Sequence, residues 1–128
     1  MDINKLRVNT ELSVDGTWVK HGDTEFLIAS LSGHKYLDAM SKHKASLAGG
    51  KTLDELEAKI ALGAILSETI LLGWKGLTEN GKEVKYTKSK AKHYLTDPDY
   101  NEFRVLIMGL ASDQEHFRYK DIEKKAKK

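Results

Sequence analysis

The longest apolar segment of the chain, Ile60 to Trp74, constrains the fold most, because it must be removed from water. It contains Glu68 and two glycines. Its fifteen residues fall short of the roughly 20 apolar residues that cross a bilayer. We therefore predict a buried helix at the centre of a core and no membrane association. The N-terminus also lacks the apolar run of a secretory signal.

The net charge of +2 is concentrated at one end of the chain. Residues 119–128 hold five lysines and two acidic residues, so the rest of the 128-residue chain carries about −1. A basic tail on a near-neutral domain argues against a dedicated nucleic-acid binder. With no cysteine, the chain has neither disulfides nor thiolate metal ligands, which suits a reducing cytoplasm.

We predict an α+β fold, mainly α, in which an N-terminal β-hairpin packs on about four helices. Residues 1–15 are expected to form a flexible N-terminal arm, residues 16–118 a single globular domain, and residues 119–128 a basic C-terminal tail. Two β-favouring runs on either side of Gly22-Asp23 predict the hairpin.

Helical spacing and capping signals place the four helices. One follows Gly33 and ends before Gly49-Gly50. The next is expected to start at Thr52, because Thr52 to Glu55 match a capping box, and to continue through Trp74. Small residues at Gly63 and Ser67 would let a neighbouring helix approach closely.

The second half of the chain is predicted to hold a turn-rich connection and two further helices. The connection, residues 73–86, bends most sharply at Asn80-Gly81. Thr87 caps a short helix with Ala91, Tyr94 and Leu95 facing inward. Asp97-Pro98 begins the last helix, which we expect to extend to Phe117 and beyond the body of the domain.

No motif carries convincing chemistry. Residues 45–52 fit a relaxed phosphate-binding loop, but the segment before them is charged and not a buried strand. The five histidines lack metal-ligand spacing, and the paired carboxylates sit at predicted helix starts, where they stabilise the helix dipole. We therefore expect no enzymatic activity, no catalytic residue, no cofactor and no metal.

The run from Leu72 to Val84, followed by Tyr86-Thr87 and Ala91, resembles the central signature of the tail assembly chaperones of long-tailed double-stranded DNA bacteriophages. In that family an apolar helix ends in Trp-x-Gly, an Asn-Gly or Asp-Gly turn follows, and a Tyr-Thr or Tyr-Ser pair opens the next helix. The order and spacing of these motifs carry the similarity, which extends over about residues 16–120.

The resemblance implies a non-enzymatic helper that binds the hydrophobic tape-measure protein and helps to recruit tail-tube subunits. It would act in the host cytoplasm and be absent from the mature virion. Family members are commonly made in two lengths through a ribosomal frameshift. The codons of the terminal lysines suit such slippage, so this chain is expected to be the short form, with the longer form as a partner and homo-oligomers possible.

The resemblance also indicates which side chains organise the fold or contact partners. Trp74 and Leu77 are expected to organise the junction between the apolar helix and the turn, and Tyr86 belongs to the same signature. Phe117 and Tyr119 are candidate partner contacts. Two other classes stay open: a nucleic-acid binder using the lysine tail, and a permanent structural component of a tail or connector.

Overall fold

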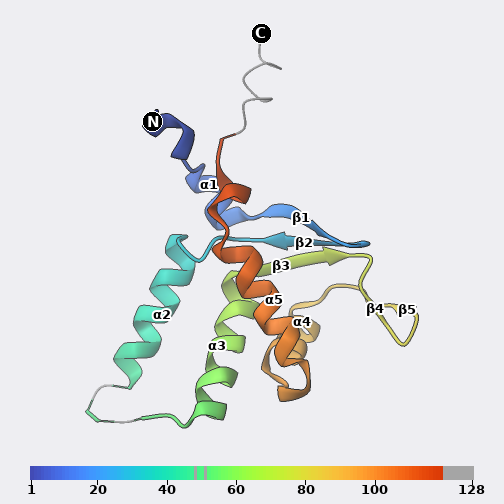
Figure 1. The fold of residues 1–128 in the computed structure, drawn as a ribbon. Helices are drawn as coiled ribbons and strands as arrows, with labels where there is room; N and C mark the ends of the chain where they lie inside the picture. The colour runs from blue at the N-terminus through green and yellow to red at the C-terminus, as the bar shows by residue number, and fades with distance from the viewer. Residues whose placement is uncertain (48, 51, 120–128) are drawn as a thin grey trace.

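A computed structural model describes residues 1–47, 49, 50 and 52–119 (Figure 1). It confirms the predicted α+β class: α-helices dominate and pack beside a small three-stranded antiparallel sheet. The basic tail from residue 120 onward lies outside the described residues.

The predicted β-hairpin is confirmed and forms two of three strands in the main sheet. Strand β1 (Thr17–His21) pairs with β2 (Thr24–Ile28), and the register places His21 opposite Thr24. Gly22 has a φ of 60°, which glycine adopts without steric cost. Strand β3 (Leu71–Lys75) pairs with the other edge of β2, giving the order β1-β2-β3.

The apolar segment is not one continuous helix as predicted. Helix α3 (Glu55–Thr69) ends at Thr69, and the chain then becomes β3. Apolar spacing alone does not distinguish a buried helix from a buried strand. The open edge of β2 decides the difference, since it offers hydrogen bonds and places Phe26 opposite Trp74. Trp74 therefore lies on a strand.

The start of α3 also differs from the prediction. Asp54, not Thr52, is the N-cap: its carboxylate accepts a hydrogen bond from the Glu57 backbone amide at 2.7 Å. The Glu57 side chain completes the capping box by accepting from the Asp54 amide. Asp and Thr are both good N-cap residues. Thr52 with Glu55 and Asp54 with Glu57 both have the three-residue spacing of a capping box, so the sequence allows two helix starts here.

The remaining helices follow the predicted order. Helix α2 (His34–Ser46) precedes α3, and α4 (Lys88–Thr96) begins after Thr87, whose hydroxyl accepts from the Lys90 amide. Asp97 caps a 3₁₀ turn, η2 (Pro98–Tyr100), that leads into α5 (Asn101–Ser112). In the connection after β3, strands β4 (Thr78–Glu79) and β5 (Lys82–Glu83) flank the predicted Asn80-Gly81 turn, where both residues have positive φ.

The last helix is shorter than predicted. It ends at Ser112, and a separate 3₁₀ helix, η3 (Gln114–Phe117), follows because Asp113 leaves the helical conformation and caps the new turn. Phe117 is fully buried. The chain therefore turns back into the core at this point.

The N-terminal segment, for which we predicted a flexible arm, contains a 3₁₀ helix, η1 (Ile3–Leu6), and helix α1 (Thr10–Asp15). Its backbone contacts the end of the described chain: the Asn9 amide donates to the Phe117 carbonyl at 2.7 Å, and Val8 forms a β-bridge with Arg118. Both ends of the described chain thus lie side by side (Figure 1).

The core lies between the sheet and helices α3, α4 and α5, which occupy one side of it in Figure 1. Gly63 on α3 lets α4 approach closely, as predicted, because a Cβ at this position would lie 2.6 Å from the Leu95 carbonyl carbon. The predicted inward residues of α4 are all buried. The largest fully buried apolar side chains are Phe26, Phe117, Ile28, Leu66, Ile70, Leu71, Leu95 and Ile107.

Candidate functional site

Trp74 and Tyr86 fasten the turn-rich connection to the sheet. The indole Nε1–H of Trp74 donates to the Val84 carbonyl at 2.7 Å, and the Tyr86 hydroxyl donates to the Leu71 carbonyl at 3.2 Å. The two rings meet edge to face with centroids 4.9 Å apart. The structure thus brings these two predicted residues together as a fold-organising pair.

Leu77 lies at the start of the same connection and is half-buried. Its carbonyl accepts from the Val84 amide at 2.8 Å, which closes the loop that carries β4 and β5. Its side chain lines a pocket beside this loop. Leu77 therefore links the Trp74–Tyr86 pair to that pocket.

Phe117 and Tyr119 lie in a different part of the molecule, beside the N-terminal segment (Figure 1). The buried Phe117 ring is a core residue in the structure. Tyr119 is 44% exposed, and its ring carries the Arg7 guanidinium 4.9 Å from its centroid. Only Tyr119 of this pair presents a side chain at the surface.

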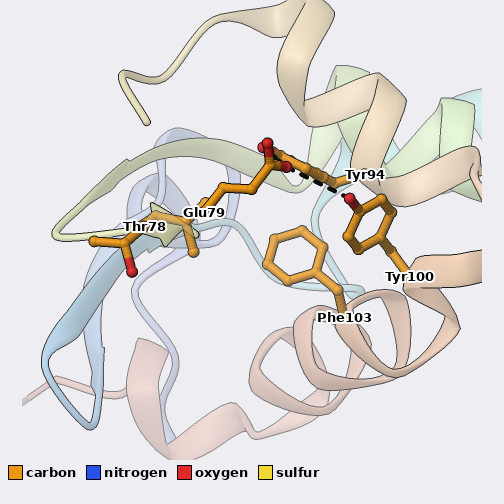
Figure 2. Close-up of a pocket in the computed structure, with 6 residues that line it drawn as sticks. Thr78, Glu79, Tyr94, Tyr100 and Phe103 are labelled. Atoms are coloured by element: carbon orange, nitrogen blue, oxygen red, sulfur yellow. Dashed lines mark hydrogen bonds between the residues drawn. The ribbon is translucent and has the colours of Figure 1, made fainter. Parts of the chain in front are cut away.

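Sequence reasoning missed a pocket of about 160 Å³, here called the aromatic pocket. It forms where β4 meets α4, η2 and α5, so residues from four separate elements share it. Figure 2 shows the Glu79 side chain reaching toward the hydroxyls of Tyr94 and Tyr100, with the Phe103 ring beside them. Its lining is Leu77, Thr78, Glu79, Tyr94, Tyr100 and Phe103.

Two tyrosines hold the carboxylate of the aromatic pocket. The Tyr94 and Tyr100 hydroxyls donate to the same oxygen of Glu79, Oε1, at 2.9 and 3.4 Å. Burial, together with this hydrogen bond to Glu79, raises the pKa of Tyr94 from 10.0 to about 12. Burial and the Glu79 carboxylate also raise the pKa of Tyr100. Both hydroxyls therefore remain protonated donors at neutral pH.

Sequence reasoning also missed a groove between α2 and α3, here called the α2–α3 groove. It has a volume of about 370 Å³. The two helices run side by side in Figure 1, and α2 has no buried residue. Four apolar side chains line this groove, and one of them, Ile60, is 41% exposed. The lining is His43, Ser46, Leu47, Leu53, Glu57, Ile60 and Ala61.

The segment that fits a relaxed phosphate-binding loop connects α2 to α3, so it follows a helix where such a loop follows a strand. Residues 48 and 51 of this segment lie outside the described residues. Within residues 1–47, 49–50 and 52–119, no group of three or more acidic or histidine side chains could hold a metal ion. No helix in the same part of the chain has the length and hydropathy of a bilayer-crossing segment.

Residues 31–128 match the model of a protein family described as the YdaY prophage protein. The chain belongs to this family. Its affiliation makes it a phage-derived protein, which agrees at this coarser level with the resemblance noted from the sequence. Comparison with curated proteins and with solved structures finds no match to the chain.

The matched region contains everything from α2 to the C-terminus, and it excludes the β1–β2 hairpin and the N-terminal segment. Both the α2–α3 groove and the aromatic pocket lie within it. These two surfaces are therefore built entirely from the part of the chain that defines the prophage family.

Proposed function

We propose that this prophage protein is a non-enzymatic tail assembly chaperone that binds an apolar segment of the tape-measure protein in the α2–α3 groove. In this proposal it also helps to recruit tail-tube subunits, acts in the host cytoplasm and leaves before the virion matures. The family match supports a phage origin, and the motif order from Leu72 to Ala91 supports the assignment to tail assembly.

The exposed apolar surface of the α2–α3 hairpin carries the proposal. The two helices leave Leu37, Leu56 and Ile60 half-exposed, and of these three Ile60 lines the groove itself. Transfer of such surface from water to a partner is favourable by about 25 cal/mol per Å². A groove between two helices suits an amphipathic helix presented by that partner.

Charge around the α2–α3 groove favours a protein partner with mixed polarity at the rim. His43 of α2 and Glu57 of α3 line the groove together with the apolar residues Leu47 and Ile60. Apolar centres with polar rims are the usual anatomy of protein interfaces. The groove thus combines a site for an apolar anchor with groups that orient it.

The test is co-expression of the chain with the tape-measure protein of the same prophage, measuring how much tape-measure protein stays soluble. We expect the wild-type chain to keep it soluble. Ile60→Glu should lower the soluble fraction several-fold, because a charge would be buried in the complex. Val105→Glu is the matched control: Val105 is 55% exposed on α5 and lies outside the groove lining.

Circular dichroism melts of both variants would check that each retains the fold. Equal effects of the two substitutions would contradict binding in the α2–α3 groove. A tape-measure protein that stays insoluble with the wild-type chain would contradict the chaperone function, and recovery of the chain in purified particles would favour a structural component. A slippery heptamer with an open overlapping frame near the end of the gene would support the longer frameshifted form.

A further inference from the structure

We propose that the aromatic pocket binds the side-chain ammonium of a lysine on a partner polypeptide. This inference does not rest on the tape-measure assignment, because it concerns a different surface and a different chemistry. It follows from the arrangement of three aromatic rings and one carboxylate around a pocket of about 160 Å³.

The rings form walls that suit a cation with an apolar stem. Tyr94 and Tyr100 meet edge to face with centroids 5.0 Å apart, and Tyr94 and Phe103 do so at 6.0 Å. Perpendicular rings present faces in different directions around one space, as in aromatic cages for ammonium groups. Leu77 adds an apolar wall for the methylenes of a lysine stem.

The Glu79 carboxylate gives the aromatic pocket a fixed negative charge. The hydroxyls of Tyr94 and Tyr100 hold its Oε1 by hydrogen bonds. Among the residues that the structure describes, no lysine, arginine or histidine nitrogen lies within 4 Å of this carboxylate. Lys82, directly opposite Glu79 in the β4–β5 register, does not pair with it either.

Two further carboxylates near Tyr100 add to this negative field. The carboxylates of Asp97 and Asp99 act on Tyr100 in the same direction as Glu79 does. The attraction between a cation and an aromatic face is strongest where the site is partly removed from water. The pocket therefore offers a cation both electrostatic attraction and desolvated ring faces.

The hydrogen bonds favour lysine over arginine. Both tyrosine hydroxyls use Oε1, which leaves Oε2 as the one Glu79 oxygen without a partner among the described groups. A guanidinium binds a carboxylate best through both oxygens at once. A lysine ammonium needs only one, and it acts as a compact point charge.

The position of the aromatic pocket favours a polypeptide ligand. Thr78 and Glu79 are exposed residues of a short edge hairpin, so a partner backbone reaches the rim while its lysine stem enters. Figure 2 shows the Glu79 side chain extending from this hairpin toward the rings.

The experiment is an NMR titration of the ¹⁵N-labelled full chain with Nα-acetyl-lysine methylamide at constant ionic strength. We expect shifts that saturate and are confined to residues of β4, η2 and the neighbouring turns of α4 and α5. The norleucine analogue, which lacks the ammonium, should cause much smaller shifts. The same titration with choline tests whether the pocket prefers a free ammonium compound, and the titration with the arginine analogue tests whether it prefers a guanidinium.

The variant Glu79→Gln keeps an acceptor for the tyrosines but removes the charge. It should weaken lysine binding about tenfold or more, which corresponds to about 1.4 kcal/mol. Glu83→Gln is the matched control on the same hairpin, because Glu83 does not line the pocket. It should leave binding unchanged.

Phe103→Leu offers a second variant that removes a ring face and retains an apolar side chain, and it should also weaken binding. Equal shifts with the norleucine analogue, or equal affinities of the Glu79→Gln and Glu83→Gln chains, would overturn the proposal. So would tighter binding of choline or the arginine analogue than of the lysine derivative, or no shift at all.

Discussion

Trp74 connects three parts of the fold through a single side chain. Its ring packs in the core opposite Phe26, its edge meets Tyr86, and its indole N–H binds the Val84 carbonyl. The sequence resemblance singled out this residue as the organiser of the junction. In the structure Trp74 lies on β3 and not at a helix end, and loss of its side chain would release both the sheet edge and the connection that follows.

Replacing Trp74 by alanine should therefore destabilise the protein by about 3 to 5 kcal/mol, the usual cost of truncating a buried aromatic residue. Urea unfolding followed by circular dichroism would measure it. The other tryptophan provides the control. Trp18 is 44% exposed and contacts the Lys75 ammonium 4.2 Å from its ring centroid, so Trp18→Ala should cost clearly less. Equal losses for the two variants would refute the role given to Trp74.

At the level of elements, the contact between α3 and α4 depends on a glycine. Gly63 is buried, and the backbone of Leu95 occupies the space that a side chain would need. The stripe of small residues on α3 predicted a close neighbour. The neighbour is α4, because the segment from β3 through the β4–β5 hairpin brings the chain back beside α3.

Gly63→Ala should destabilise the protein by about 1 to 3 kcal/mol through overpacking. Helix propensity alone would predict the opposite change in stability, since it favours alanine over glycine by about 1 kcal/mol. Gly109→Ala on α5 is the matched comparison, since nothing lies within 4 Å of a Cβ at that exposed position. Thermal melts should show a lower midpoint for Gly63→Ala and an equal or higher one for Gly109→Ala. A stabilised Gly63→Ala chain would contradict the close packing of α3 and α4.

For the whole molecule, buried phenols link stability to alkaline pH. Burial raises the pKa values of Tyr36, Tyr86, Tyr94 and Tyr100, and the value for Tyr94 reaches about 12. The folded state prefers the neutral phenol more strongly than the unfolded chain does. The resulting stabilisation is complete below the ordinary pKa of 10.0 and is lost as the pH rises through about 12.

We therefore expect the free energy of unfolding to fall between pH 10 and pH 12. Tyr94→Phe removes one ionising hydroxyl, so its stability should fall less steeply over the same interval. Denaturant titrations at several pH values would measure the slope, and the absorbance of tyrosinate would follow ionisation directly. Tyr119→Phe, at an exposed position, should keep the wild-type slope. A Tyr94→Phe slope as steep as that of the wild type would refute the linkage.

Features that depend on neighbours along the chain could be predicted before the fold was known. The Gly22-Asp23 hairpin, the Asn80-Gly81 turn and the Thr87 cap are set by local backbone preferences. Apolar spacing likewise predicted the buried face of α4. Their conformations therefore follow from the local sequence and not from which tertiary neighbours they have.

Features that depend on distant partners could be found only in the folded molecule. Residues 71–75 became a strand because the edge of β2 was open, and Phe117 entered the core because the N-terminal segment binds its backbone. The aromatic pocket combines side chains that lie up to 26 positions apart, from Leu77 to Phe103. Such contacts carry no local signal in the sequence, since packing free energy depends on which surfaces meet in space.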